Sequence, residues 1–217
     1  MKFFIDTANL DQIREANDLG ILDGVTTNPS LMAKEGIRGE ENIAKHYKTI
    51  SDIVKGDVSA EVVSTDFDGI IAEGKKLAAI NSNIIVKVPM IKEGVKAIKW
   101  FTDNGIATNC TLCFSAGQAI LAAKVGAKYI SPFIGRIDDS GWDGIELIAQ
   151  IANIYAIQGF ETQILAASIR SALHIVKCAE AGANVVTSPL EPILGLLKHP
   201  LTDIGLAKFL ADAKGTK

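Results

Sequence analysis

The sequence predicts a closed barrel of eight parallel β-strands with α-helices around it, a (β/α)8 barrel. Short runs rich in β-branched residues alternate with longer amphipathic helical patterns along all 217 residues. Parallel neighbouring strands need crossover connections, which the helical patterns supply. An open doubly wound sheet is the competing arrangement. It usually has about five or six strands and a glycine-rich turn after the first, whereas here the first strand ends in Asp6-Thr7-Ala8.

The eight strands are expected at Lys2–Asp6, Gly24–Thr26, Ser59–Val63, Ile84–Val88, Ala107–Thr111, Tyr129–Phe133, Gln163–Ala166 and Val185–Ser188. Helical patterns cover Leu10–Leu19, Gly39–Val54, Asp66–Ile80, Glu93–Asn104, Ser115–Val125, Gly144–Gln158, Ser171–Ala181 and Pro192–Leu197, with an extra C-terminal helix near Thr202–Ala213. Four helical runs are followed by a glycine, the residue that best adopts the left-handed conformation at a helix end. No linker or low-complexity tract interrupts this pattern, so we expect a single domain over residues 1–217.

Composition limits the classes of partner. The formal net charge is −3, and no run of Lys or Arg exceeds two residues, so we expect no nucleic-acid partner. No apolar stretch reaches 18 residues, and Asp6 interrupts the apolar N-terminus where a signal peptide would continue. We therefore expect a cytoplasmic protein without a membrane partner.

Cys110 and Cys113 form a C-x-x-C pattern, which raises a redox site or a zinc site as alternatives. The surrounding residues predict a strand, in which residues three apart point to opposite faces. No second cluster supplies further zinc ligands. We therefore expect no metal, and thiols that pack as small hydrophobic groups.

Polar residues recur at the carboxyl ends of the predicted strands, where (β/α)8-barrel enzymes place their working groups. A packed core would not need them. The predicted ring comprises Asp6, Thr26, Thr27, Asn28, Glu61, Lys87, Asn109, Thr111, Ser131, Arg136, Ser168, Arg170 and Ser188.

Lys87 is the most informative of these residues because it lies within an apolar strand, IIVKVP. By alternation it shares a face with Ile85, opposite Val86 and Val88. If that face is the barrel interior, burial disfavours the ammonium form, and a free amine can attack a carbonyl to give a Schiff base. A lysine that snorkels at the strand end or pairs with an acid is the alternative, and this feature alone leaves both open.

Asp6 and Glu61 end two strands and could project over the same mouth as a pair of acid–base groups. A helix cap for Asp6, or an ion pair for either carboxylate, is the alternative. Arg136 and Arg170 follow later strands and suit bidentate recognition of a phosphate, unless they pair with nearby acids such as Asp138 and Asp139.

Several of these segments together resemble the transaldolase family. GVTTNPSL (Gly24–Leu31) resembles its signature, and IIVKVP resembles the segment with its Schiff-base lysine. FIDTAN, the strand that ends in Glu61, TNCTLCFSAGQA, SPFIGRIDD and LAASIR follow in the family's order. The length is similar to that of the short subfamily, which includes fructose-6-phosphate aldolases and tends to form decameric rings.

The resemblance implies a cofactor-free enzyme of the pentose phosphate pathway. It would move a dihydroxyacetone unit from sedoheptulose 7-phosphate to glyceraldehyde 3-phosphate, giving erythrose 4-phosphate and fructose 6-phosphate. Lys87 would be the nucleophile and Asp6 the acid–base group, and Glu61 with Thr111 would hold a catalytic water. By the same resemblance Asn28, Asn109 and Ser131 would contact the ketol hydroxyls, and Arg136, Ser168 and Arg170 the phosphate.

Within the family, plain aldolases tend to have tyrosine where this chain has Phe133, and glutamine where it has Glu61. Phenylalanine has no proton to give to an enamine, so Phe133 with Glu61 favours transfer over release of free dihydroxyacetone. Fructose-6-phosphate aldolase remains the nearest alternative. A catalytically silent barrel that binds sugar phosphates is another, although such a protein would not need a buried lysine.

Overall fold

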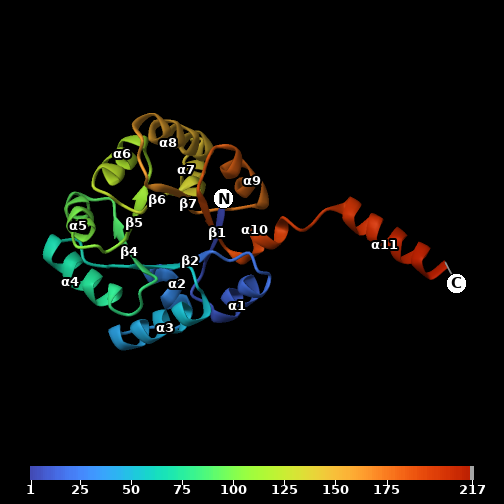
Figure 1. The fold of residues 1–217 in the computed structure, drawn as a ribbon, viewed down its shortest axis with the longest axis horizontal. Helices are drawn as coiled ribbons and strands as arrows, with labels where there is room; N and C mark the ends of the chain where they lie inside the picture. Colours follow the sequence, from blue (N-terminus) through green and yellow to red (C-terminus); the bar gives the residue numbers. More distant parts are fainter. Residues whose placement is uncertain (216–217) are drawn as a thin grey trace.

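The computed structural model describes residues 1–215 and contains a closed barrel in which each strand pairs in parallel with the next and β8 pairs with β1. Helices surround this barrel (Figure 1). The strands are β1 (Lys2–Asp6), β2 (Gly24–Thr26), β3 (Asp57–Glu61), β4 (Ile84–Pro89), β5 (Thr108–Cys113), β6 (Tyr129–Pro132), β7 (Gln163–Ala166) and β8 (Val185–Ser188). The predicted fold class is therefore confirmed.

The helices are α1 (Leu10–Asp18), α2 (Pro29–Lys34), α3 (Glu40–Ile53), α4 (Phe67–Ala78), α5 (Lys92–Asp103), α6 (Ala116–Lys124), α7 (Ile134–Asp139), α8 (Gly144–Gln158), α9 (Ala172–Glu180), α10 (Leu190–Gly195) and α11 (Pro200–Gly215). The sequence did not predict α2 and α7, each of six residues and therefore too short to show a helical period. The third strand begins and ends two residues earlier than predicted, so Val62 and Val63 belong to the loop.

The apolar residues form two layers, one inside the barrel and one between the barrel and the helices. The interior contains Phe4, Ile85, Tyr129, Leu165, Ala167 and Val185. Val86 and Val88 lie in the outer layer instead. Alternation predicted that Lys87 shares a face with Ile85 and left open whether that face is the interior; because Ile85 faces inward, Lys87 faces inward too.

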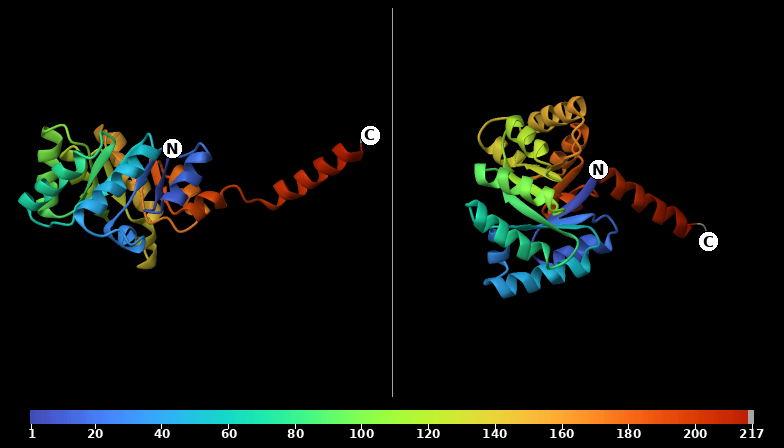
Figure 2. Two further views of the ribbon diagram at one scale, coloured as in Figure 1. Left: turned by 90° about the horizontal axis from the view of Figure 1, so that it is seen from below. Right: turned by 60° about the vertical axis from the view of Figure 1, so that its left-hand side comes forward.

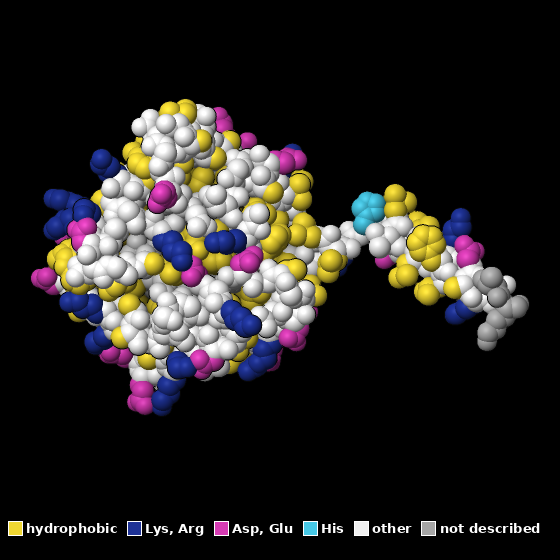
Figure 3. Space-filling view, in the orientation of Figure 1, with side chains coloured by type: hydrophobic (Ala, Val, Ile, Leu, Met, Phe, Trp, Pro, Cys, Tyr) yellow, Lys and Arg dark blue, Asp and Glu magenta, His cyan; other side chains and the backbone are white. Residues whose placement is uncertain are grey.

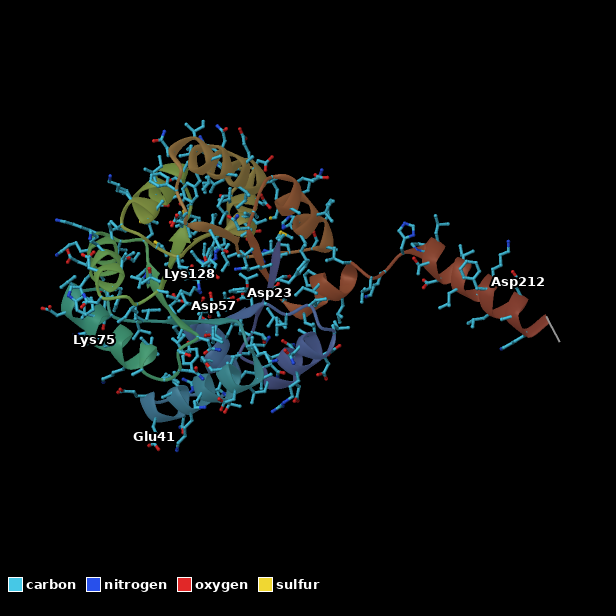
Figure 4. The ribbon with its side chains drawn as sticks, in the orientation of Figure 1. Asp23, Glu41, Asp57, Lys75, Lys128 and Asp212 are labelled. Carbon is cyan, nitrogen blue, oxygen red and sulfur yellow. The ribbon has the colours of Figure 1, made fainter. Side chains whose placement is uncertain are left out.

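Polar contacts occupy the amino-terminal end of the barrel. The Asp57 carboxylate, at the start of β3, accepts a hydrogen bond from the Tyr129 hydroxyl and pairs with Lys128, both at 2.6 Å. Asp23, just before β2, accepts a hydrogen bond from the Phe3 backbone. Asp23, Asp57 and Lys128 lie over the middle of the ring in Figure 4. These contacts leave the opposite, carboxyl-terminal end of the strands for a functional site.

Strand β5 departs from regular alternation near its end. Its pairing with β6 shifts between Cys110 and Cys113, and Leu112 adopts a left-handed φ of 59°. Both thiols consequently pack in the same outer layer. The prediction that they are buried is confirmed, and the prediction that they point to opposite faces is wrong because of this irregularity.

The C-terminal helix α11 projects away from the barrel in all three ribbon views (Figures 1 and 2). None of its described residues is buried. Apolar side chains cover much of its visible surface in Figure 3, and the exposed ones are Leu201, Ile204, Leu206, Phe209 and Leu210. No helix among residues 1–215 is both long and apolar enough to cross a membrane.

Candidate active site

A cavity of about 110 Å³ lies at the carboxyl-terminal ends of the strands. Its lining joins residues from five strands with the loops that follow them. The lining residues are Asp6, Thr26, Asn28, Lys87, Ser131, Phe133, Arg136, Ala167, Ser168 and Thr187. The resemblance gave a role to ten residues and, with Phe133 at the branch point, to eleven in all. Seven of these eleven line the cavity: Asp6, Asn28, Lys87, Ser131, Phe133, Arg136 and Ser168.

Parallel register brings Glu61, Lys87 and Asn109 to one level on three adjacent strands. Glu61 of β3 pairs with Lys87 of β4, which pairs with Asn109 of β5. The three side chains are far apart in sequence, and the closed sheet makes them neighbours.

The Lys87 side chain is buried, with 5% of the residue's surface exposed, and two acceptors hold its amine. A Glu61 carboxylate oxygen lies 2.9 Å from Nζ, and the Thr27 backbone carbonyl accepts a hydrogen bond from Nζ at 3.1 Å. The sequence left two alternatives for Lys87, an interior amine or an ion pair with an acid, and the structure combines them. The lysine is interior, and it also pairs with an acid.

The two carboxylates approach Lys87 differently. Asp6 lines the cavity, as predicted. Glu61 does not line it, although the sequence suggested a shared mouth. Instead its side chain lines a separate hollow of about 420 Å³ bounded mainly by α3 and α4. Lys87 therefore has the cavity on one side and the Glu61 carboxylate on another.

Burial raises the pKa of Asp6 above its ordinary value of 3.8. The positive charge of Lys87 and a hydrogen bond from the Thr26 hydroxyl, at 2.7 Å, oppose this increase but do not cancel it. Thr26 also lies 2.6 Å from the hydroxyl of Thr187. A carboxyl group with a raised pKa is better matched to proton transfer near neutral pH than an exposed aspartate.

Buried polar groups on β3, β5 and β6 form a chain of hydrogen bonds. The Ser131 hydroxyl donates to Asn109 Oδ1 at 2.7 Å, and Asn109 Nδ2 donates to Ser59 Oγ at 3.1 Å. Asn109 and Thr111 are fully buried and lie outside the cavity lining. Thr111 Oγ1 has no hydrogen-bond partner among the described residues, so its hydroxyl is free to bind a water or a substrate group.

The far wall of the cavity contains Phe133, Arg136 and Ser168. The Arg136 guanidinium lies 5.0 Å from the centre of the Phe133 ring, a cation–π distance. Ser168 has a left-handed φ of 62°, which is unusual for a residue with a side chain. Strained backbone of this kind is found most often at functional sites.

Arg170 lies outside the cavity lining and pairs with Asp139 at 2.5 Å. This is the surface pairing that the sequence left open as an alternative to phosphate binding. Arg170 packs against Gly135, where an added side chain would come within 2.2 Å of the Ser168 carbonyl oxygen and 2.7 Å of the arginine Nε. The glycine before Arg136 thus lets the loops after β6 and β7 approach each other.

The structure also corrects the predicted ring at its last strand. Ser188 is fully buried, donates to the Pro189 carbonyl and does not line the cavity. Thr187 lines it instead, which alternation from the interior Val185 could have shown. Asn28 lines the cavity and also caps α2, since its Oδ1 accepts from the Leu31 amide at 3.0 Å.

A closed (β/α)8 barrel, an interior lysine held by a carboxylate and a second carboxyl group with a raised pKa define a class of protein. It is the class of barrel enzymes equipped for Schiff-base chemistry at a carbonyl.

Comparisons with known proteins identify the family. Residues 3–216 match the family described as Transaldolase/Fructose-6-phosphate aldolase. The chain is 68% identical over 214 residues to a probable transaldolase of Cytophaga hutchinsonii, covering 99% of this chain and 98% of the relative. A probable transaldolase of Parabacteroides distasonis has the same identity and coverage, and one of Phocaeicola vulgatus is 67% identical. The chain belongs to the transaldolase/fructose-6-phosphate aldolase family.

Proposed function

We propose that this protein is a transaldolase that moves a dihydroxyacetone unit between sugar phosphates through a Schiff base on Lys87. The observation that carries the proposal is the buried Lys87 amine, 2.9 Å from Glu61 and lining the same cavity as Asp6. The probable transaldolases that share about two thirds of its residues support the same reaction.

The first half of the reaction forms the Schiff base and cleaves the donor. The Lys87 amine adds to the C2 carbonyl of a ketose phosphate, and loss of water gives the iminium. Asp6 then takes the proton of the C4 hydroxyl while the C3–C4 bond breaks, and the bonding electrons pass to the iminium to form an enamine. An aldose phosphate leaves with the new aldehyde. Sedoheptulose 7-phosphate and fructose 6-phosphate are the proposed donors.

The second half reverses these steps with another aldose phosphate, such as glyceraldehyde 3-phosphate. The enamine carbon attacks the acceptor aldehyde, and Asp6 returns its proton to the new hydroxyl. Water then hydrolyses the iminium and frees Lys87. Glu61 and Thr111 are the groups we assign to this water: Glu61 contacts the amine directly, and the Thr111 hydroxyl has free hydrogen-bonding capacity.

The remaining lining residues bind the substrate in this proposal. Asn28 and Ser131 are in the cavity and can contact the ketol hydroxyls, while Asn109 orients Ser131 through their 2.7 Å hydrogen bond. Arg136 and Ser168 form the phosphate end of the cavity. Arg170 can join them when its pairing with Asp139 is exchanged for the phosphate, because a dianion competes well for a guanidinium.

Transfer rather than release follows from Phe133, which lines the cavity without offering a proton to the enamine. The enamine therefore waits for an acceptor aldehyde. Fructose-6-phosphate aldolase is the runner-up, and it is distinguished by accumulation of free dihydroxyacetone when no acceptor is supplied.

Borohydride trapping tests the proposal directly. The enzyme is incubated with fructose 6-phosphate and borohydride, digested, and analysed by mass spectrometry for the reduced adduct. We expect the adduct on Lys87, and we expect Lys87→Ala to lose turnover while its circular dichroism is unchanged. An adduct on Lys92 or Lys99, or activity of Lys87→Ala within about tenfold of the wild type, would contradict it.

We further propose that the enzyme is a cytoplasmic homo-oligomer, with a decamer as the assembly that the resemblance implies. The support for an oligomer is α11, whose five large apolar side chains are exposed and are not buried against their own barrel. Exposed apolar surface of this kind marks a contact with another protein. Light scattering on the full chain should give a multiple of the 23.1 kDa protomer, and Phe209→Asp should reduce it.

A further inference from the structure

Tyr47 is a buried tyrosine on α3, an outer helix, yet its hydroxyl reaches the residues that hold Lys87. Only 2% of its surface is exposed. Its oxygen lies 2.7 Å from the Thr27 hydroxyl, and the Glu61 backbone is near enough to lower its pKa. Among residues 1–215, Thr27 accepts a hydrogen bond from the Lys87 amine and Glu61 forms an ion pair with it.

The direction of the hydrogen bond between Tyr47 and Thr27 follows from the proton on the phenol and from the second hydrogen bond that Thr27 makes. Burial raises the pKa of Tyr47 to about 12, so the phenol keeps its proton at neutral pH. The Thr27 hydroxyl donates to the Ser59 carbonyl at 3.3 Å, which leaves its oxygen to accept from Tyr47. Through the Thr27 hydroxyl, the phenol is thereby linked to the end of β2 and to Ser59 of β3, next to the lysine.

We propose that Tyr47 is a positioning residue for the reaction, because it fixes the Thr27 carbonyl and Glu61 and through them the attack geometry of Lys87. The inference rests on the proposed Schiff-base function of Lys87. Tyr47 itself does not line the substrate cavity, so its effect should fall on the formation of the iminium and not on substrate binding.

Misplacing a reacting group by about 1 Å can cost about a hundredfold in rate. Tyr47 contacts Thr27 and not the Lys87 amine itself, so loss of its hydroxyl should displace Lys87 by less than about 1 Å. We therefore expect Tyr47→Phe to slow iminium formation by about ten- to a hundredfold. Turnover and kcat/KM should fall together, with KM for fructose 6-phosphate little changed.

The chain offers a matched control in Tyr155. Its hydroxyl donates to the Ala119 carbonyl at 2.7 Å and is also buried, but it lies in the outer layer away from the cavity. Tyr155→Phe therefore removes one buried hydrogen bond of the same kind. We expect it to lower the melting temperature without slowing iminium formation.

The experiment measures the rate of trapping with fructose 6-phosphate under saturating borohydride, so that iminium formation is rate-limiting. Tyr47→Phe and Thr27→Val should each be slow, and the double variant should be no slower than the slower single one, because both break the same link. Trapping by Tyr47→Phe at the wild-type rate, or slowed only as much as Tyr155→Phe, would overturn the inference.

Two further outcomes keep this test separate from the proposed function. If Tyr47→Phe does not fold, a folded Thr27→Val that traps at the wild-type rate overturns the inference instead. If the wild type gives no adduct on Lys87, the Schiff-base assignment has failed. If the wild type does form that adduct and both variants react normally, the role of Tyr47 alone has failed.

Discussion

Two buried threonines on β5 separate the stability cost of an unpaired hydroxyl from a role in catalysis. Substituting each of them by valine tests the two effects. Thr108 and Thr111 are both fully buried, and neither hydroxyl has a hydrogen-bond partner among the described residues. By alternation Thr108 faces the outer layer with Cys110, whereas Thr111 faces the barrel interior. An unsatisfied buried hydroxyl costs about 1–3 kcal/mol, which valine removes with almost the same shape.

We expect Thr108→Val to raise the free energy of unfolding by about 1–3 kcal/mol. In a chain of this size each kcal/mol raises the melting temperature by about 2–4 °C. We expect Thr111→Val to gain less, because in the proposed mechanism its hydroxyl binds a water that satisfies that group. Thr111→Val should also lose up to about a hundredfold in turnover, the lower end of what positioned proton transfer contributes.

Calorimetry and a coupled transaldolase assay on both variants provide the measurement. Full turnover by Thr108→Val at a raised melting temperature is the expected control result. The reasoning fails if Thr111→Val is stabilised as much as Thr108→Val and keeps its activity. A Thr108→Val variant that is destabilised would show that its hydroxyl has a partner in solution.

Four further substitutions concern the cavity and the Arg170–Asp139 pair beside it. Phe133→Tyr should raise the ratio of dihydroxyacetone release to transfer. A positioned acid contributes about 10²–10⁴-fold to a proton transfer. The new hydroxyl would lie on a residue that lines the 110 Å³ cavity. An unchanged ratio in a folded, active variant would remove Phe133 from the branch point. Arg136→Ala should raise KM for phosphorylated donors far more than for unphosphorylated ones. Asp139→Asn should lower KM for phosphorylated donors, because it frees Arg170 from its ion pair. Equal effects on both donor types would mean that the arginines are structural. Asp6→Asn should abolish turnover yet raise the melting temperature at neutral pH. Because the folded-state pKa of Asp6 is raised, ionising its carboxyl group lowers the stability of the folded protein above that pKa. The difference in melting temperature between Asp6→Asn and the wild type should therefore shrink as pH falls toward 3.8. A difference that is constant with pH would contradict this.

The sequence was sufficient for features that depend on local periodicity. Four of the eight strands begin and end where predicted, because a buried strand shows its apolar run directly. Alternation placed Lys87 on the same face as Ile85, and the longer outer helices were predicted from their 3.6-residue period. The position of the site followed from a rule of the fold, that parallel strands present their carboxyl ends at one face.

Other features depended on contacts between residues far apart in the chain. The pairing of Lys87 with Glu61 is set by the register of β3 against β4, which no local pattern encodes. The left-handed Leu112 overturned the prediction that Cys110 and Cys113 point to opposite faces, because leucine gives no local signal for that conformation. The choice of Arg170 between Asp139 and the cavity depended on how the loops after β6 and β7 pack.

By itself the sequence determined the barrel, the shared face of Lys87 and Ile85, and part of the set of polar groups at the mouth. Each of these can be read from residue type and from hydrophobic periods of 2 or 3.6 residues. The tertiary structure alone decided which of these groups touch. It placed Glu61 against the Lys87 amine and outside the cavity, and it brought Tyr47 from an outer helix to the back of the site. The physical reason is that hydrogen bonds require distances of about 3 Å, which closure of the sheet and side-chain packing set across the whole chain.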